Sequence, residues 1–488
     1  MRRLHAGKGT GRLMASIANE PAGATPIPAW SADAWRAGIY ALAIVSYLLA
    51  SLLHLGWLMP VASLLALASI LVSLPGAGPI GRVLALLFLA GGYWMLWRAA
   101  VPWPQYLLAH GQMLSLLALF AVLPVLSVPV RLGQYGGSIE TLLSSRISGV
   151  FQLNCVVTAL AFLCGSFMSL AAVPIMLTSM APVVGNYPLR DATRFTAVSA
   201  TYGYVLPILW TPVSGVVGVV LQSLHLQWLS LLPALMTLSV LALLLNWAIF
   251  YLLELRGHAG KADPSAVTPA SAGAALSHLS KMLLAIVLMV AAIGIIDHVS
   301  GIGMLTVVTL LAIPFALAWS MALGRGRDFL RAGTQQLATR LPRMADQFAI
   351  FLAAGFFVSA MHLSGADHAV NLTFLHLHDL LGTRLFLLAM PAMALAASFI
   401  GVHPMVAIAL LGESLKPEAL GIGANLLAIT LIGSSVLTYM LGPFSGTLGL
   451  VQAITRVSSY RLALWNLPYA LGYVALLAAT ILLLAGRA

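Results

Sequence analysis

Residues 205–220 read VLPILWTPVSGVVGVV, and residues 436–451 read VLTYMLGPFSGTLGLV. Each stretch is apolar and is interrupted by Pro-x-Ser-Gly. A proline removes a helix N–H and clashes with the preceding turn, so each stretch predicts a helix that is broken in its middle. Chance similarity between two Leu-, Val- and Gly-rich segments is the alternative. The stretches agree at seven of sixteen positions, which are Val205/Val436, Leu206/Leu437, Pro212/Pro443, Ser214/Ser445, Gly215/Gly446, Gly218/Gly449 and Val220/Val451.

A second pair of similar stretches precedes the first pair. Residues 164–176 read CGSFMSLAAVPIM, and residues 396–406 read AASFIGVHPMV. Both contain Ser-Phe, then small residues, then Pro. The distance from the serine to the first valine of the broken helix is 39 residues in one case and 38 in the other. Two features in the same order at nearly the same spacing predict an internal duplication.

The composition places the chain in a membrane. Of its 488 residues, 61% are hydrophobic and only 8% are charged, whereas a soluble domain has about 25% charged residues. Apolar runs of roughly 20 residues recur along the chain, and each is long enough to span a bilayer. The sequence therefore predicts an all-α polytopic membrane protein with the lipid bilayer as a partner. The net charge of +11 is explained by Arg and Lys in short loops, so we expect no nucleic-acid partner.

The distribution of Lys and Arg among the loops predicts the topology. It gives about eleven transmembrane helices with a cytoplasmic N-terminus, as in a bacterial-type inner membrane. An odd number of crossings separates the two predicted re-entrant hairpins, so they open to opposite faces, as in an inverted-repeat transporter. The predicted segments are a cytoplasmic tail (1–36), a first membrane half (37–253) with a hairpin (148–186) and a broken helix (195–221), a cytoplasmic linker (254–279), and a second half (280–488) with a hairpin (383–416) and a broken helix (423–455).

The first hairpin has a competing interpretation. Residues 148–186 are long enough to make one continuous crossing, which would place Arg190 and Arg194 on the external side. Because short loops rich in arginine favour the cytoplasm, we expect the hairpin instead.

Two hairpins with serine-bearing tips, each followed by a Pro-broken helix, are the arrangement by which this chain resembles the ion transporter superfamily. That superfamily includes divalent-anion/sodium symporters and arsenite-pump membrane subunits. The resemblance covers residues 60–486 by architecture, and by motif only the two tips and the two breaks. It implies a protomer with a scaffold and a transport domain, often dimeric, that moves its substrate by an elevator motion. The symporters carry Ser-Asn-Thr at each tip, where this chain has Ser166-Phe167-Met168 and Ser398-Phe399-Ile400. The coupling ion, sodium or a proton, is therefore left open.

The predicted binding site lies where helices end inside the membrane. The positive N-terminal end of each second half-helix suits an anion, and the carbonyl groups of the first halves suit a cation. Hydroxyls at the tips and breaks add neutral ligands, and His403 offers a group for proton binding or for hydrogen bonding to an anion. A back-bond to its own helix is the alternative for any single hydroxyl. The predicted site residues are Ser166, Ser169, Thr211, Pro212, Ser214, Gly215, Ser398, His403, Pro443, Ser445 and Gly446.

These observations predict a secondary active transporter of a small anionic solute, coupled to H+ or Na+, without a cofactor and without enzymatic activity. An integral membrane enzyme and a non-transporting membrane subunit are the alternatives. The polar groups available to an enzyme lie on a predicted external segment, residues 363–381, and their spacing matches no metal-ligand pattern. The two cysteines, Cys155 and Cys164, form neither a disulfide framework nor a zinc motif.

Overall fold

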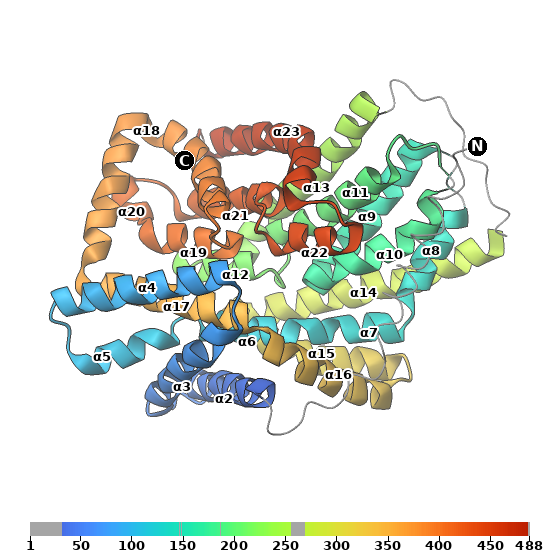
Figure 1. The fold of residues 1–488 in the computed structure, drawn as a ribbon. Coiled ribbons are helices and arrows are strands. Elements are labelled where there is room, and N and C mark those ends of the chain that lie inside the picture. The colour runs from blue at the N-terminus through green and yellow to red at the C-terminus, as the bar shows by residue number, and fades with distance from the viewer. Residues whose placement is uncertain (1–31, 146, 148, 186, 255–268, 487–488) are drawn as a thin grey trace.

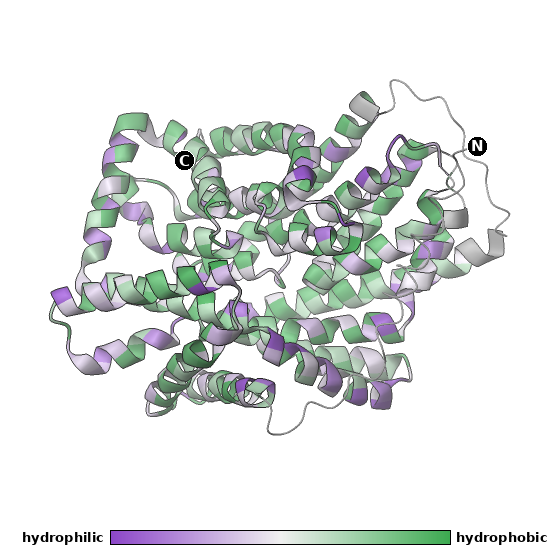
Figure 2. Cartoon of the chain, in the orientation of Figure 1, coloured by the Kyte–Doolittle hydropathy of each residue, from purple (hydrophilic) through white to green (hydrophobic). Residues whose placement is uncertain are grey.

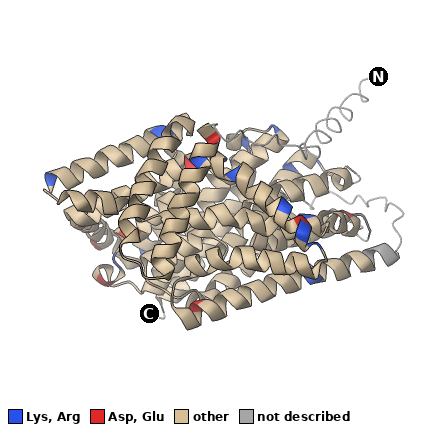
Figure 3. Cartoon of the chain, turned by 90° about the horizontal axis from the view of Figure 1, so that it is seen from below, with Lys and Arg blue, Asp and Glu red and all other residues tan. Residues whose placement is uncertain are grey.

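The computed structural model describes residues 32–145, 147, 149–185, 187–254 and 269–486 (Figure 1). Most of the predicted tail, 1–36, and part of the predicted linker, 254–279, lie outside the described residues. The described part contains only helices, turns and loops. Green, hydrophobic residues recur along most helices in Figure 2, and the residues coloured blue or red as charged are sparse in Figure 3. The predicted all-α polytopic membrane class is confirmed.

The helices of the first half run from α2 to α13. They are α2 (Ala32–Leu52), α3 (Leu58–Ser73), α4 (Pro79–Arg98), α5 (Trp103–Leu108), α6 (Leu114–Val122), α7 (Ser127–Leu132), α8 (Tyr135–Ser145), α9 (Val150–Met168), α10 (Ala172–Val184), α11 (Ala192–Val205), α12 (Gly215–Ser223) and α13 (Trp228–Glu254).

The helices of the second half run from α14 to α23. They are α14 (Pro269–Ser300), α15 (Met304–Ala322), α16 (Gly326–Arg340), α17 (Ala345–Ser364), α18 (Ala366–Phe399), α19 (Pro404–Ser414), α20 (Pro417–Leu420), α21 (Ala424–Leu441), α22 (Gly446–Thr455) and α23 (Ser459–Ala485).

Twelve helical segments among the described residues are long and apolar enough to cross a membrane, against the eleven crossings that the sequence predicts. The two counts differ in which segments they include. The twelve contain Val150–Val184 and Ala366–Phe399, which the sequence pattern assigns in whole or in part to hairpins. They omit the predicted crossing at 195–221, because the structure divides it into two short helices, α11 and α12.

The segment from α9 to α10 turns back on itself. At its tip, Ser169 has a positive φ of 51°, a conformation that stops a helix of L-residues. The Tyr187 hydroxyl, just after α10, donates a hydrogen bond to the Ile147 carbonyl oxygen, just before α9, over 2.9 Å. A continuous 40-residue helix would separate these ends by about 60 Å. The hydrogen bond therefore identifies a hairpin, and the single-crossing interpretation is wrong.

The second hairpin is built from the later part of α18 and from α19, which pack together. Within α18 the backbone changes direction at Gly382, which has φ 71° and ψ 159°, one residue before the predicted start of this hairpin. Residues 400–403 form the tip, and Gly401 there has φ 105°. This conformation is readily available only to glycine.

Both Pro-x-Ser-Gly motifs break a helix, as predicted. In the first, α11 and a short 3-10 turn (Pro207–Leu209) end before residue 211, and α12 begins at Gly215. In the second, α21 ends at Leu441 and α22 begins at Gly446. The serine of each motif occupies the N-cap position of the second half-helix. Such N-caps have extended backbone, which separates the two helical pieces.

Two predicted boundaries need correction. Helix α2 begins at Ala32, inside the predicted tail. Helix α14 begins at Pro269, so the last part of the predicted linker is helical. The proline occupies the first helical position, where its missing N–H costs nothing, and the small residues that follow are compatible with a helix.

The interior of the bundle contains the broken helices. Nearly every residue of α6, α12 and α21 is buried, whereas α14 and α23 expose many leucines on one side. A helix that is apolar and buried all round lies inside a membrane protein, and a helix with an exposed apolar face borders lipid. Helix α12, which begins at the first break, and helix α21, which ends at the second, are therefore surrounded by protein, where the backbone groups freed at the breaks can be satisfied.

Candidate functional site

A cavity of about 200 Å³ lies where both hairpin tips and both helix breaks come together. Its walls come from α6, the tip between α9 and α10, α11, α12, α16, α17, α19, α21 and α22. The lining residues are Phe120, Leu123, Pro124, Gly165, Met168, Ser169, Leu170, Ala171, Tyr204, Ile208, Thr211, Val213, Ser214, Gly215, Val216, Arg340, Met344, Gln347, Phe351, His403, Met405, Tyr439, Gly446 and Thr447. The two motif pairs that the sequence singles out thus meet in one place.

The predicted site residues divide between the cavity wall and the protein interior. Those that line the cavity are Ser169, Thr211, Ser214, Gly215, His403 and Gly446. Those outside the lining are Ser166, Pro212, Ser398, Pro443 and Ser445. The residues outside the lining shape the tips and the breaks instead of facing the cavity.

The first break is tied to the first hairpin tip. The Thr211 hydroxyl donates a hydrogen bond to the Ser166 carbonyl oxygen over 2.6 Å. The Ser166 hydroxyl in turn donates to the Phe162 carbonyl oxygen within its own helix over 2.8 Å. Ser166 therefore contributes its backbone carbonyl to the contact with the break. Its hydroxyl is already bonded within its own helix, which is the alternative to ligand binding.

The N-terminus of α12 forms part of the cavity wall. Ser214, Gly215 and Val216 all line the cavity, and no side chain caps the first amides of α12. The first four N–H groups of a helix lack partners within it, and the helix dipole adds a partial positive charge there. A negatively charged group in the cavity is therefore favoured at this wall.

The second break has a different set of hydrogen bonds. The Ser445 hydroxyl donates to the Tyr439 carbonyl oxygen over 3.0 Å and accepts from the Leu448 amide over 3.3 Å. It is thus satisfied inside its own helix pair, while Gly446 and Thr447 face the cavity. Ser398 is fully buried next to Gly442, and its hydroxyl has no hydrogen-bond partner among the described residues.

His403 fixes the start of α19. Its Nδ1 accepts a hydrogen bond from the Met405 amide over 3.3 Å, so Nδ1 carries no proton and the neutral ring has its hydrogen on Nε2. The ring meets Phe351 and Tyr439 edge-on, with ring centres 5.4 and 6.1 Å apart. In this geometry His403 is a structural cap that also offers one N–H donor.

Arg340 and Gln347 line the cavity, although the sequence pattern does not single them out. Both are exposed, so they lie at its open side. The sequence places Arg340 in a basic run with Arg331, and nothing in its spacing distinguishes the two. No Asp or Glu is among the described residues that line the cavity. Its one charged side chain in the described lining is that of Arg340, and the uncapped N-terminus of α12 adds a partial positive charge, so both favour an anion.

The polar groups of the predicted external segment do not converge on one site. His362 lies 3.5 Å from Asp367, whereas His378 pairs with Asp379 at 3.6 Å and His376 bonds to the Leu372 carbonyl of its own helix. Within the described ranges no group of three His, Cys, Asp or Glu residues is arranged to hold a metal ion.

Comparisons with known proteins agree with this architecture. The structure is similar to the crystal structure of the YdaH transporter of Alcanivorax borkumensis, which has an unusual topology, with a TM-score of 0.59. The two chains share 16% identity over 83% of this chain and 98% of that chain. This protein has a transporter-like fold. No protein-family model matches the chain, and no curated protein matches it. The membership in the ion transporter superfamily thus stays a prediction.

Proposed function

We propose that the protein is a secondary active transporter that carries a small anionic solute bound in the cavity between the tips and breaks. The observation that supports this most directly is the charge of that cavity. Arg340 and the uncapped N-terminus of α12 face the same space, and no carboxylate is among its described lining residues. Hydroxyls from Ser169 and Ser214 add neutral donors. Substrate sites of this kind lie at discontinuous helices near mid-membrane.

The two halves are, in our proposal, inverted repeats. Thr211 and Gly442 occupy equivalent positions, as do Ser166 and Ser398. In the first half the Thr211 hydroxyl binds the Ser166 backbone. In the second half Gly442 lies against Ser398, whose hydroxyl fills the space that a side chain at position 442 would need. The same tip-to-break contact is therefore made twice with different chemistry.

Contacts between the halves are reciprocal as well. A Cβ placed at Gly215, in the first break, would lie 2.9 Å from Met405 of the second hairpin. A Cβ placed at Gly446, in the second break, would lie 3.6 Å from Leu170 at the first tip. Each break therefore faces the hairpin of the other half, as a two-fold axis in the membrane plane requires.

The hairpins open toward opposite ends of the first broken helix. The base of the first hairpin is followed directly by Asp191, which caps α11. At the far end of the same broken helix, Ser223 binds Glu413 near the base of the second hairpin. This arrangement supports alternating access, in which a unit made of both hairpins and both broken helices moves as an elevator within the remaining helices.

The ion coupling remains part of the proposal. Protons and sodium are both compatible with the tips, which carry hydroxyls and His403 in place of the symporter Ser-Asn-Thr sequence. A homodimer is also proposed, on the superfamily resemblance alone.

Uptake into proteoliposomes tests the function. The purified protein is reconstituted and offered radiolabelled organic and inorganic anions under imposed sodium or proton gradients. We expect uptake of at least one anion above that of protein-free liposomes, and dependence on one gradient. Transport of cations only, or equal leakage of every solute without saturation, would contradict an anion transporter.

A further inference from the structure

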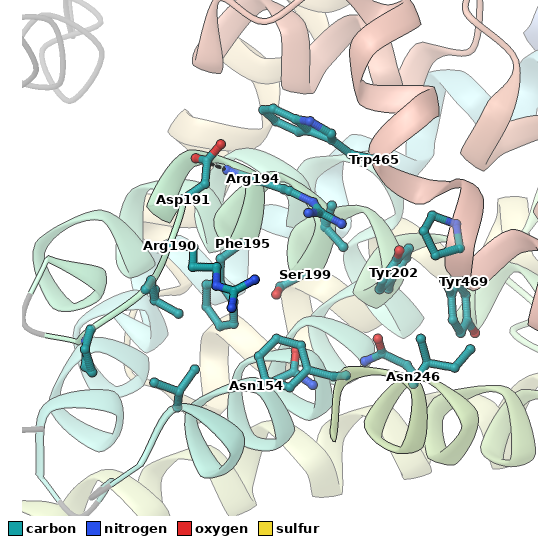
Figure 4. Close-up of a pocket in the computed structure, with 17 residues that line it drawn as sticks. Asn154, Arg190, Asp191, Arg194, Phe195, Ser199, Tyr202, Asn246, Trp465 and Tyr469 are labelled. Atoms are coloured by element: carbon teal, nitrogen blue, oxygen red, sulfur yellow. Dashed lines mark hydrogen bonds between the residues drawn. The ribbon is translucent and has the colours of Figure 1, made fainter. Parts of the chain in front are cut away.

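A second cavity, of about 340 Å³, lies apart from the breaks and tips (Figure 4). It is enclosed by α9, the loop before α11, α11, α13 and α23. None of the predicted site residues lines it. The residues around it are Val150, Asn154, Pro188, Leu189, Arg190, Asp191, Arg194, Phe195, Val198, Ser199, Tyr202, Asn246, Ile249, Phe250, Trp465, Pro468 and Tyr469.

The rim of this cavity is positively charged. Arg190 and Arg194 lie on the same side of the cavity, four residues apart in the chain (Figure 4). The one acidic residue of the described lining, Asp191, accepts a hydrogen bond from the Arg194 amide over 2.9 Å and so caps α11. An arginine keeps its positive charge whatever else it contacts, and its planar fork of N–H groups matches the oxygens of an anion.

The depth of the cavity holds two amides with unused hydrogen bonds. Asn154 of α9 is 2% exposed and Asn246 of α13 is 4% exposed. The side-chain nitrogen of each has no hydrogen-bond partner among the described residues. Both side chains lie on the wall opposite the arginines (Figure 4). A buried unpaired donor is costly, and a half-turn of either amide would present its N–H to an acceptor in the cavity.

The remaining wall of the second cavity is formed by α23, whose exposed leucines border lipid. Trp465 and Pro468 of α23 line the cavity, and next to them on the same helix Leu464, Leu467 and Leu471 are 66%, 41% and 64% exposed. The Arg461 guanidinium lies 5.3 Å from the Trp465 ring centre. Tryptophan beside arginine at a helix end is typical of the membrane–water interface.

From this combination we propose that the second cavity binds an anionic phospholipid. The phosphodiester lies between Arg190 and Arg194, the ester carbonyls of the glycerol accept from Asn154 and Asn246, and the acyl chains follow the exposed leucines of α23. The cavity is large enough for the headgroup and glycerol only, so the chains lie outside it. Basic pockets between transmembrane helices recognise anionic headgroups in this way. The site is separate from the proposed solute cavity.

Native mass spectrometry of the full-length purified protein tests the proposal. The protein in detergent is titrated with dioleoylphosphatidylglycerol, with dioleoylphosphatidylcholine, and with glycerol phosphate as the free anion. We expect saturable retention of phosphatidylglycerol and weak retention of the other two. In the double variant Arg190→Gln/Arg194→Gln the affinity for phosphatidylglycerol should fall about thirtyfold. The matched control is Arg327→Gln/Arg331→Gln, an exposed pair with the same four-residue spacing on α16, and it should bind like wild type.

A second variant covers the case in which the double variant fails to fold. Val198→Trp leaves both arginines in place and fills the cavity from its wall, so it should also abolish retention of phosphatidylglycerol. Unchanged retention in both folded variants would overturn the proposal. Equal retention of both phospholipids would show that charge plays no part and would also overturn it. Binding of glycerol phosphate as tight as that of the lipid would assign the cavity to a small anion instead.

Discussion

The Ser223 hydroxyl donates a hydrogen bond to the Glu413 carboxylate over 2.7 Å, which joins the end of α12 to the end of α19. The same carboxylate lies 3.6 Å from His362 of α17. Lys416 bonds to Asp367 of α18 over 2.9 Å. The base of the second hairpin is therefore held to α12 by the Ser223–Glu413 hydrogen bond and to α17 and α18 by the other two contacts, while Gly215 and Met405 meet at the opposite end of α12. Contacts at both ends thus hold α12 against α19, which supports placing both helices in the proposed moving unit.

A disulfide between α12 and α19 should leave transport intact. A Cβ placed at Gly412 would lie 3.4 Å from the Ser223 Cβ, close to the separation of about 3.5–4.5 Å found in disulfides. We therefore expect Ser223→Cys/Gly412→Cys to cross-link on oxidation in a background that carries Cys155→Ser and Cys164→Ala. If both helices belong to the moving unit, oxidised and reduced protein should transport at similar rates in proteoliposomes.

The contrasting pair joins α12 to a helix outside the proposed unit. Gly218 of α12 packs directly against Leu305 of α15. The variant Gly218→Cys/Leu305→Cys should lose transport when oxidised and regain it on reduction. Loss of transport in the first pair together with full activity in the second would reverse the assignment of moving and fixed helices and would contradict the proposed elevator unit.

Arg340 should set the affinity for the anion. Replacing it with Gln removes the charged donor at the open side of the solute cavity. Hydrogen bonds to charged groups contribute about 1.5–3 kcal/mol, so the KM of uptake should rise at least about tenfold. Arg340→Lys should recover part of the affinity because the charge is kept and the planar fork is lost. Arg331→Gln, on the same helix and outside the cavity lining, is the control. A KM unchanged in Arg340→Gln would remove the arginine from the site.

The helix breaks could be predicted from sequence because their cause is local. A proline followed by Ser-Gly stops a helix whatever packs around it, so α12 and α22 begin at the predicted glycines. The roles of the two serines could not be predicted. Ser214 faces the cavity while Ser445 bonds inside its own helix pair, although both stand in the same Pro-x-Ser-Gly motif. The difference depends on contacts with other helices, which a single sequence does not specify.

The place of Arg340 in the cavity could not be predicted for the same reason. Arg340 reaches the cavity only because α16 packs beside α6 and α17 follows directly. Its sequence neighbours identify a basic surface helix and nothing more. The helical start of α14 could not be predicted either, because a segment rich in Ala, Ser and Gly after a proline is compatible with either a loop or a helix.

Thr211→Val should destabilise the protein. The substitution preserves the shape of the side chain and removes the donor to the Ser166 carbonyl oxygen, 2.6 Å away and buried. An unpaired buried acceptor costs about 1–3 kcal/mol, so the thermal unfolding midpoint in detergent should fall. Thr196→Val, which removes an exposed back-bond on α11, should change stability by less than about 0.5 kcal/mol. Equal effects of the two substitutions would mean that the tip and the break are not coupled through this bond.

Substitutions of glycines near the breaks should distinguish a loss of solute binding from a loss of helix packing. A Cβ at Gly215 would lie 2.9 Å from both Met405 and Phe120, two residues of the cavity wall. Gly215→Val should therefore fill the cavity and abolish uptake, while the flexible end of Met405 limits the loss of stability. Gly218, one turn further on, packs against Leu305, so Gly218→Val should lower thermal stability first and uptake as a consequence.

Gly449 provides the control because it is equivalent to Gly218 in the repeat but has open space around it. A Cβ placed at Gly449 would have no neighbouring side chain within 4 Å, so Gly449→Val should keep both uptake and stability near wild type. The measurement is saturable anion uptake beside the thermal unfolding midpoint of each purified variant. If Gly215→Val transports normally, or if Gly215→Val and Gly449→Val lose uptake and stability to the same extent, the cavity at the breaks is not the solute site.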